Sequence, residues 1–211
     1  MFSLPGLAAQ CGRPPDSRSI SMIELDPAST ALILIDLQKG ILGTPAEPHS
    51  CAAVFAKGIE LSERFRAAGA PVVRVRVDLG PGLADAPSGL VDAPPPFPPG
   101  GLPADFAEFP DDPAAHGDLI VTKRHWGAFH GTDLDLRLRR RGVRTVVIGG
   151  VATNIGVEST ARSAHEHGYH VVLVEDATTG RSAAMHAFAF EHIFPRLARV
   201  AKSADLHFVA A

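Results

Sequence analysis

The sequence predicts a three-layer α/β/α domain built on a six-stranded, mainly parallel sheet. Two observations support this fold class. Six short runs rich in Val, Ile and Leu alternate with longer stretches whose apolar residues have helical spacing. The short runs are almost continuously apolar, as in strands that are covered on both faces. A length of 211 residues is sufficient for one such domain with a sizeable core.

Strands and helices are expected to alternate along most of the chain. The strands are expected at residues 31–35, 71–77, 119–121, 145–148, 170–174 and 199–202. The helices are expected at residues 49–68, 133–141, 155–167 and 182–193. Because successive parallel strands are joined by right-handed crossovers, this alternation predicts helices on both faces of the sheet.

The first 21 residues depart from this alternation. They lack periodicity, and they lack the positive-then-apolar order of a secretory signal. We therefore expect a poorly ordered tail at residues 1–21, followed by a single domain at 22–211.

A proline-rich segment interrupts the pattern in the middle of the chain. Residues 78–118 hold ten of the 18 prolines, a density that excludes a long regular helix. A loop of this length commonly forms a lid, a partner surface or a pocket wall. The alternative is a surface excursion packed by Phe97, Phe106 and Phe109.

The charge and composition of the chain limit the kinds of binding partner that are expected. A net charge of −3 gives no reason to expect binding to nucleic acid or to anionic membranes. No apolar run approaches the ~20 residues that span a bilayer. The cysteines, Cys11 and Cys51, form neither a metal-ligand spacing nor a disulfide framework, which favours a reducing, cytoplasmic location. We expect a small-molecule substrate, with no nucleic acid or membrane partner.

Polar residues follow three of the expected strands. Asp36 closes the first strand, Lys123 follows the third, and a glycine-containing turn at 150–156 follows the fourth. Ligands of open parallel sheets bind beyond the carboxyl ends of the strands, so these groups are expected to share one crevice. The alternatives are a capping role for the aspartate and a solvated surface position for the lysine.

Four segments make the sequence resemble a known superfamily. They are Ala31–Gln38, Lys123–Leu134, Gly150–Arg162 and Val174–Ala177. In order and spacing they resemble the isochorismatase-like hydrolases, which include nicotinamidases, carbamoylsarcosine amidohydrolases and isochorismatases. The resemblance covers about residues 22–206. The chain looks most similar to an uncharacterised bacterial branch with glycine in place of the nucleophilic cysteine.

The resemblance implies a set of catalytic residues. In most of the family a cysteine at the strand-to-helix turn attacks the substrate, an aspartate acts as its base, and a lysine holds charge in place. The matching positions are Asp36 and Lys123, while Gly156 occupies the position of the cysteine. The resemblance also implies a cis peptide bond between Val151 and Ala152. Covalent catalysis is not expected, because glycine offers no nucleophile.

Isochorismatases resemble this chain in having glycine at that position. They hydrolyse a vinyl ether with the aspartate as proton donor, and such a reaction proceeds through protonation and capture by water. The resemblance thus implies a hydrolase of an enol ether or related carboxylate, with Asp36 as general acid or base. The residues expected to bind substrate are Gln38, Trp126, Phe129, Val151, Ala152, Thr153, Asn154 and Ile155. An acid catalyst needs a pKa near the working pH; a neighbouring Lys⁺ lowers it and burial raises it.

No metal or other cofactor is expected. The histidines His49, His116, His125 and His130 lack the spacing of a zinc site. Ser159 and Thr160 lie one turn into the helix after the glycine, where packing roles are favoured over nucleophilic ones. Arg74 and Arg76 alternate with valines, and surface exposure is favoured over carboxylate binding.

Two other functions stay open at this stage. One is a non-catalytic ligand-binding or oligomerisation member of the same fold. The other is a cysteine amidohydrolase, which would require Cys51 or Cys11 to reach the site. The resemblance also implies a homo-oligomer, without fixing its stoichiometry.

Overall fold

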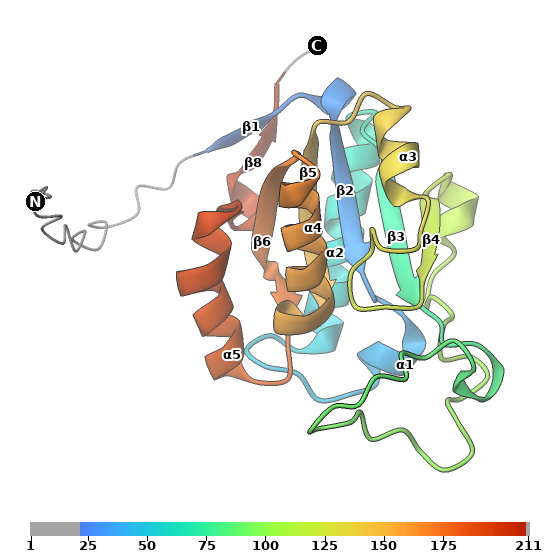
Figure 1. Cartoon of the computed structure of the whole chain (residues 1–211). Helices are drawn as coiled ribbons and strands as arrows, with labels where there is room; N and C mark the ends of the chain where they lie inside the picture. The colour runs from blue at the N-terminus through green and yellow to red at the C-terminus, as the bar shows by residue number, and fades with distance from the viewer. Residues whose placement is uncertain (1–21, 210–211) are drawn as a thin grey trace, which may run out of the picture.

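A computed structural model describes residues 22–209, and the expected α/β/α architecture is confirmed within them (Figure 1). The expectation for residues 1–21 lies outside the described residues. The central layer is a parallel sheet with strand order β4-β3-β2-β5-β6-β7. Its strands are β2 (Thr30–Ile35), β3 (Val72–Val77), β4 (Leu119–Lys123), β5 (Thr145–Val151), β6 (His170–Thr179) and β7 (Arg199–Ala201). Strands β2 and β5 lie side by side at the centre, with β3 and β4 beyond β2 and with β6 and β7 beyond β5.

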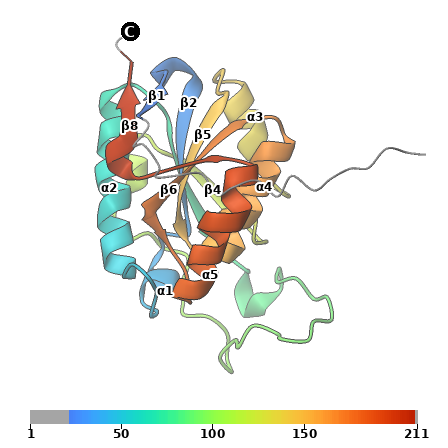
Figure 2. The same ribbon diagram turned by 90° about the vertical axis from the view of Figure 1, so that its left-hand side faces the viewer.

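Helices cover both faces of this sheet (Figure 2). Helix α2 (Cys51–Ala67) lies on one face, and α3 (Leu134–Arg139), α4 (Glu158–Glu166) and α5 (Ala183–Phe188) lie on the other. Among the described residues, none of the helices is both long enough and apolar enough to cross a bilayer.

Three elements were not expected from the sequence. A short helix α1 (Lys39–Leu42) follows β2, and strands β1 (Ile23–Leu25) and β8 (Leu206–Phe208) pair in parallel as a separate two-stranded sheet. These elements have three or four residues each and lie outside the alternation of strands and helices from which the other elements, including the short β7, were expected.

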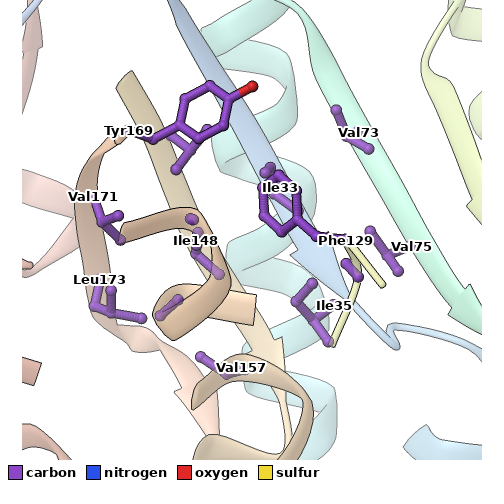
Figure 3. Packing of buried hydrophobic residues seen from close by; sticks show 14 of the residues in the cluster. Ile33, Ile35, Val73, Val75, Phe129, Ile148, Val157, Tyr169, Val171 and Leu173 are labelled. Atoms are coloured by element: carbon purple, nitrogen blue, oxygen red, sulfur yellow. The ribbon is translucent and has the colours of Figure 1, made fainter. Parts of the chain in front are cut away.

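The alternation of side chains along β2 explains why its sequence is apolar throughout. Ile33 and Ile35 pack with residues of α3 and α4 on one face, as Figure 3 shows for part of this cluster. Leu32 and Leu34 pack against α2 on the other face. All are fully buried, and burying each such side chain stabilises the fold by about 1.5–3 kcal/mol.

The proline-rich segment is fixed to strand β3 by an ion pair. Arg74 on β3 is fully buried, so the expectation of surface exposure is wrong for this residue. Its guanidinium donates two hydrogen bonds to Asp111, at 2.7 and 2.9 Å, and lies 5.0 Å from the centre of the Phe109 ring. Phe106 packs over Gly40, whereas Phe97 is 39% exposed. Two of the three expected aromatic anchors therefore hold the segment.

This anchoring predicts the effect of neutralising Asp111. Asp111→Asn leaves the buried Arg74 without its counter-charge and should lower the free energy of unfolding by about 2–3 kcal/mol. Urea denaturation would measure this change. The matched control is Asp105→Asn in the same segment, because the Asp105 side chain is 55% exposed and its variant should leave the midpoint unchanged. Equal midpoints for wild type and Asp111→Asn would contradict the proposed anchor.

Candidate active site

The candidate site lies where the strand order of the sheet reverses. Ligands of open parallel sheets bind at this point, and here it falls between the carboxyl ends of β2 and β5. Asp36 follows β2 directly, with a φ of 54° that aspartate tolerates better than most residues. Gly150 on β5 pairs with Ile35, and a Cβ atom at Gly150 would collide with the Ile35 carbonyl oxygen. Glycine is therefore required for the close approach of the two strands.

Asp36 and Lys123 meet at this edge of the sheet. Lys123 ends β4, two strands away from β2, and its long side chain brings Nζ within 2.8 Å of Oδ2 of Asp36. The same ammonium donates to the carbonyl oxygen of His125 at 3.1 Å. The two side chains are only 2% and 9% exposed, so the charges face each other with little screening by water. An ammonium has three donors, and these contacts account for two.

The two oxygens of Asp36 have different surroundings. Oδ2 accepts the hydrogen bond from Lys123, whereas Oδ1 is buried and has no hydrogen-bond partner among the described residues. Burial raises the pKa of Asp36 to about 6, although the charge and the hydrogen bond of Lys123 lower it. Burial thus outweighs the ion pair. Oδ1 is the oxygen on which a proton would reside, because Oδ2 already accepts from the ammonium.

A sharp turn after β5 completes the site. The peptide bond between Val151 and Ala152 is cis, which confirms the expectation from the resemblance. A π-helical turn (Thr153–Val157) follows, and the N–H groups of Ile155 and Val157 both donate to the carbonyl of Ala152. The turn continues directly into α4.

Gly156 is the residue of this turn that faces Asp36. A Cβ atom built on Gly156 would lie 3.2 Å from Oδ2 of Asp36, 3.0 Å from a methyl carbon of Ile35 and 3.5 Å from the carbonyl oxygen of Trp126. The turn thus packs closely against Asp36 and Ile35 at a position where a side chain would be crowded, and no side-chain nucleophile stands beside the carboxylate.

Thr160 connects the turn to the loop that follows β4. Its hydroxyl donates to the carbonyl of Gly156 at 2.6 Å and accepts from the N–H of Ala128 at 3.1 Å. The side chain is fully buried. These contacts give Thr160 the packing role that the sequence favoured over a nucleophilic one.

Three of the expected substrate-binding residues lie outside the turn. The Gln38 amide is buried; Nε2 donates to the carbonyls of Val77 and Phe106, and Oε1 accepts from the N–H of Val77. Gln38 thereby joins the ends of β2 and β3 to the proline-rich segment. The Phe129 ring lies in the core (Figure 3), whereas the Trp126 side chain is 61% exposed. Substrate contacts of these three residues stay a prediction.

The expected substrate-binding residues within the turn differ in burial. Val151 and Thr153 are buried, and Ala152, Asn154 and Ile155 are partly buried. Nδ2 of Asn154 lies 3.5 Å from the sulfur of Met185, so this side chain reaches α5. Thr153 Oγ1 lies 2.8 Å from Nδ1 of His186, also on α5. Their contacts with a substrate likewise stay a prediction.

His186 belongs to a cluster that the sequence analysis missed. It lies beside His49 and Glu175, and the ligand atoms of the three residues are within 4.8 Å of one another. Glu175 follows the expected strand core at 170–174, so the strand-end criterion that selected Asp36 also applied to it. Nothing in the spacing pointed to His49 or His186 as its neighbours.

The fold and the site define a three-layer α/β/α protein with polar groups at the carboxyl edge of a parallel sheet, and comparisons identify the family. An isochorismatase domain model matches residues 30–205. The uncharacterized isochorismatase family protein YecD of Escherichia coli O157:H7 is 47% identical over 180 residues, which is 85% of this chain and 95% of that protein. The chain belongs to the isochorismatase family, whose members are hydrolases.

Solved structures agree with this assignment. An isochorismatase family protein from Burkholderia thailandensis has a TM-score of 0.81 and 45% identity, covering 88% of this chain and 97% of its own. The N-carbamoylsarcosine amidase from Thermoplasma acidophilum has a TM-score of 0.64 and 27% identity, covering 83% and 96%. The chain is thus similar over most of its length both to an isochorismatase family protein and to an N-carbamoylsarcosine amidase.

The protonation of Asp36 can be observed directly. Carboxyl ¹³C NMR of the folded protein should show Asp36 titrating near pH 6, and Lys123→Met should move the midpoint upward by removing the opposing charge. Because the pKa of Asp36 in the folded protein exceeds its ordinary value of 3.8, protonation of Asp36 contributes fully to the free energy of unfolding below about pH 4, and this contribution is lost as the pH rises through 6. The urea-unfolded chain provides the reference titration. A folded-state midpoint at the unfolded value would contradict the dominance of burial.

Proposed function

We propose that this protein hydrolyses a small enol ether or related carboxylate without a cysteine nucleophile. One observation carries the proposal: Oδ1 of Asp36 is buried without a hydrogen-bond partner among the described residues, and burial raises the pKa of this carboxyl to about 6. A general acid works best when its pKa lies near the working pH. Asp36 meets this condition, and the resemblance to the family implies that Gly156 occupies the position of the cysteine that most members carry.

Asp36 would act by moving one proton. Its Oδ1–H protonates the terminal carbon of the enol ether, which gives an oxocarbenium ion and leaves Asp36 ionised. Water adds to this ion, and the resulting hemiketal separates into an alcohol and a carbonyl compound. A proton released from the added water restores Asp36. The cycle balances with water as the only co-reactant, so no side-chain nucleophile is required.

Lys123 would select the charge of the substrate and stabilise the ionised acid. When Asp36 is protonated, the buried ammonium lacks its counter-charge, which favours a substrate that carries a carboxylate. As Asp36 loses its proton, the ion pair at 2.8 Å re-forms. The backbone from Val151 to Gly156 would form the facing wall. Lys123 therefore acts both before and after the proton transfer.

A thiol mechanism has no support among the described residues. Cys51 is buried at the start of α2, its sulfur lies 3.4 Å from the carbonyl of Thr44, and burial raises its pKa. A raised pKa lowers the fraction of the reactive thiolate. Cys11 lies outside the described residues.

We further propose that the protein acts in the cytoplasm as a homo-oligomer. The free thiol of Cys51 is consistent with a reducing compartment. Phe188 and Met185 on α5 are 57% and 54% exposed and supply apolar surface for self-association.

Replacing Asp36 tests the mechanism. Asp36→Asn should lower kcat by at least 100-fold on a hydrolysed enol ether, because the amide cannot supply the proton, while substrate binding persists. The matched control is Asp105→Asn, whose side chain is 55% exposed and whose variant should leave kcat unchanged. Iodoacetamide treatment should leave turnover unchanged. No turnover across a panel of enol ethers and esters, with ligand binding retained, would favour the non-catalytic alternative.

The pH profile separates an acid from a base. For a general acid, log kcat should fall with a slope approaching −1 as the pH rises above about 6, because the protonated fraction of Asp36 falls tenfold per pH unit. Steady-state kinetics from pH 4.5 to 8.5 would measure the profile. A rate that rises through pH 6 would instead assign Asp36 as a base.

A further inference from the structure

A second polar cluster lies on the α5 side of the sheet, outside the Asp36 site. His49 Nε2 lies 2.9 Å from Oε1 of Glu175, and His186 Nε2 lies 3.4 Å from the same oxygen. The two imidazole rings are nearly perpendicular, with centres 5.9 Å apart. Two histidine nitrogens and one carboxylate thus converge on a common volume.

Each member of this cluster is held by its own element. Glu175 lies on β6, and His186 lies on α5, where its side chain is only 4% exposed. His49 precedes α2, and its carbonyl oxygen accepts a hydrogen bond of 2.6 Å from the hydroxyl of Thr179 on β6. Their positions are therefore set by the fold, which lowers the entropic cost of binding an ion.

We propose that His49, Glu175 and His186 bind a divalent transition metal ion of the zinc type. Imidazole nitrogen and carboxylate oxygen are common zinc ligands, and sets of three protein ligands leave a coordination position open. In a tetrahedral zinc site, neighbouring ligand atoms are about 3.3 Å apart. The nitrogens Nε2 of His49 and Nε2 of His186 lie 2.9 and 3.4 Å from Oε1 of Glu175, on either side of this value. The ligand atoms of the two histidines are within 4.8 Å of each other, so small side-chain rotations complete the geometry.

The surroundings of His186 match those of a metal ligand. Its Nδ1 lies 2.8 Å from Oγ1 of Thr153, which can accept the Nδ1–H and leave Nε2 as the metal-binding nitrogen. Hydrogen bonds of this kind fix the tautomer and the orientation of ligating histidines. The side chains of His49 and Glu175 are 32% and 26% exposed, which gives an ion access from solvent.

Metal binding to the purified full-length chain tests this assignment. Tag-free protein is stripped with a chelator and dialysed against micromolar Zn²⁺, and bound zinc is measured by mass spectrometry. One zinc per chain is expected. His49→Gln and Glu175→Gln should each weaken zinc binding by at least tenfold, since each removes a direct ligand. Both side chains are partly exposed, so folding should persist, and circular dichroism would verify it.

The matched control is another histidine–glutamate pair. His192 lies 3.9 Å from Glu191, and both side chains are more than 60% exposed, so His192→Gln should bind zinc like the wild type. Co²⁺ provides a second readout, because tetrahedral coordination gives intense visible absorption that the two ligand variants should lose. Absence of stoichiometric zinc, or zinc binding retained in both ligand variants, would overturn the proposal and leave a purely hydrogen-bonded cluster.

Discussion

The buried pair of Asp36 and Lys123 is the constraint on which the site depends. Moving either charge out of water costs several kcal/mol, and the partner at 2.8 Å, together with the hydrogen bond from Lys123 to the His125 carbonyl, offsets that cost. The pair joins strands that are not neighbours, since β3 lies between β2 and β4. Gln38 binds both the strand end of β3 and the proline-rich segment, and so fixes the edge across which Lys123 reaches. The proline-rich segment thus supports the ion pair from outside the sheet.

The unequal environments of the two Asp36 oxygens turn this ion pair into a candidate acid. A carboxylate with both oxygens well paired would keep a low pKa and could not donate a proton near neutral pH. Here Lys123 satisfies Oδ2 alone, and the buried Oδ1 remains without a partner among the described residues. Leaving a buried acceptor unpaired costs about 1–3 kcal/mol. Such a cost is characteristic of groups retained for function, and a substrate or a proton would remove it.

The site residues that lie at the ends of strands could be predicted from the sequence. Asp36 and Lys123 were located because parallel strands present their carboxyl ends at one edge of the sheet. The balance between burial and charge at Asp36 could not be predicted, because burial depends on packing from distant segments. The Phe129 ring, expected near substrate, lies in the core, since residues adjacent in a loop can point in opposite directions. His49 was missed as a neighbour of Glu175 because 126 residues separate them.

The two polar centres share one structural element, the turn from Thr153 to Val157. Thr153 bonds His186, while Gly156 in the same turn faces Asp36. Only two residues lie between Thr153 and Gly156, and the N–H groups of Ile155 and Val157 both donate to the carbonyl of Ala152. The same short turn therefore contacts both His186 and Asp36. Because coupling between binding sites is reciprocal, any change that a metal ion at His186 caused in ligand affinity at Asp36 would be matched by an equal change that the ligand caused in the affinity for the ion.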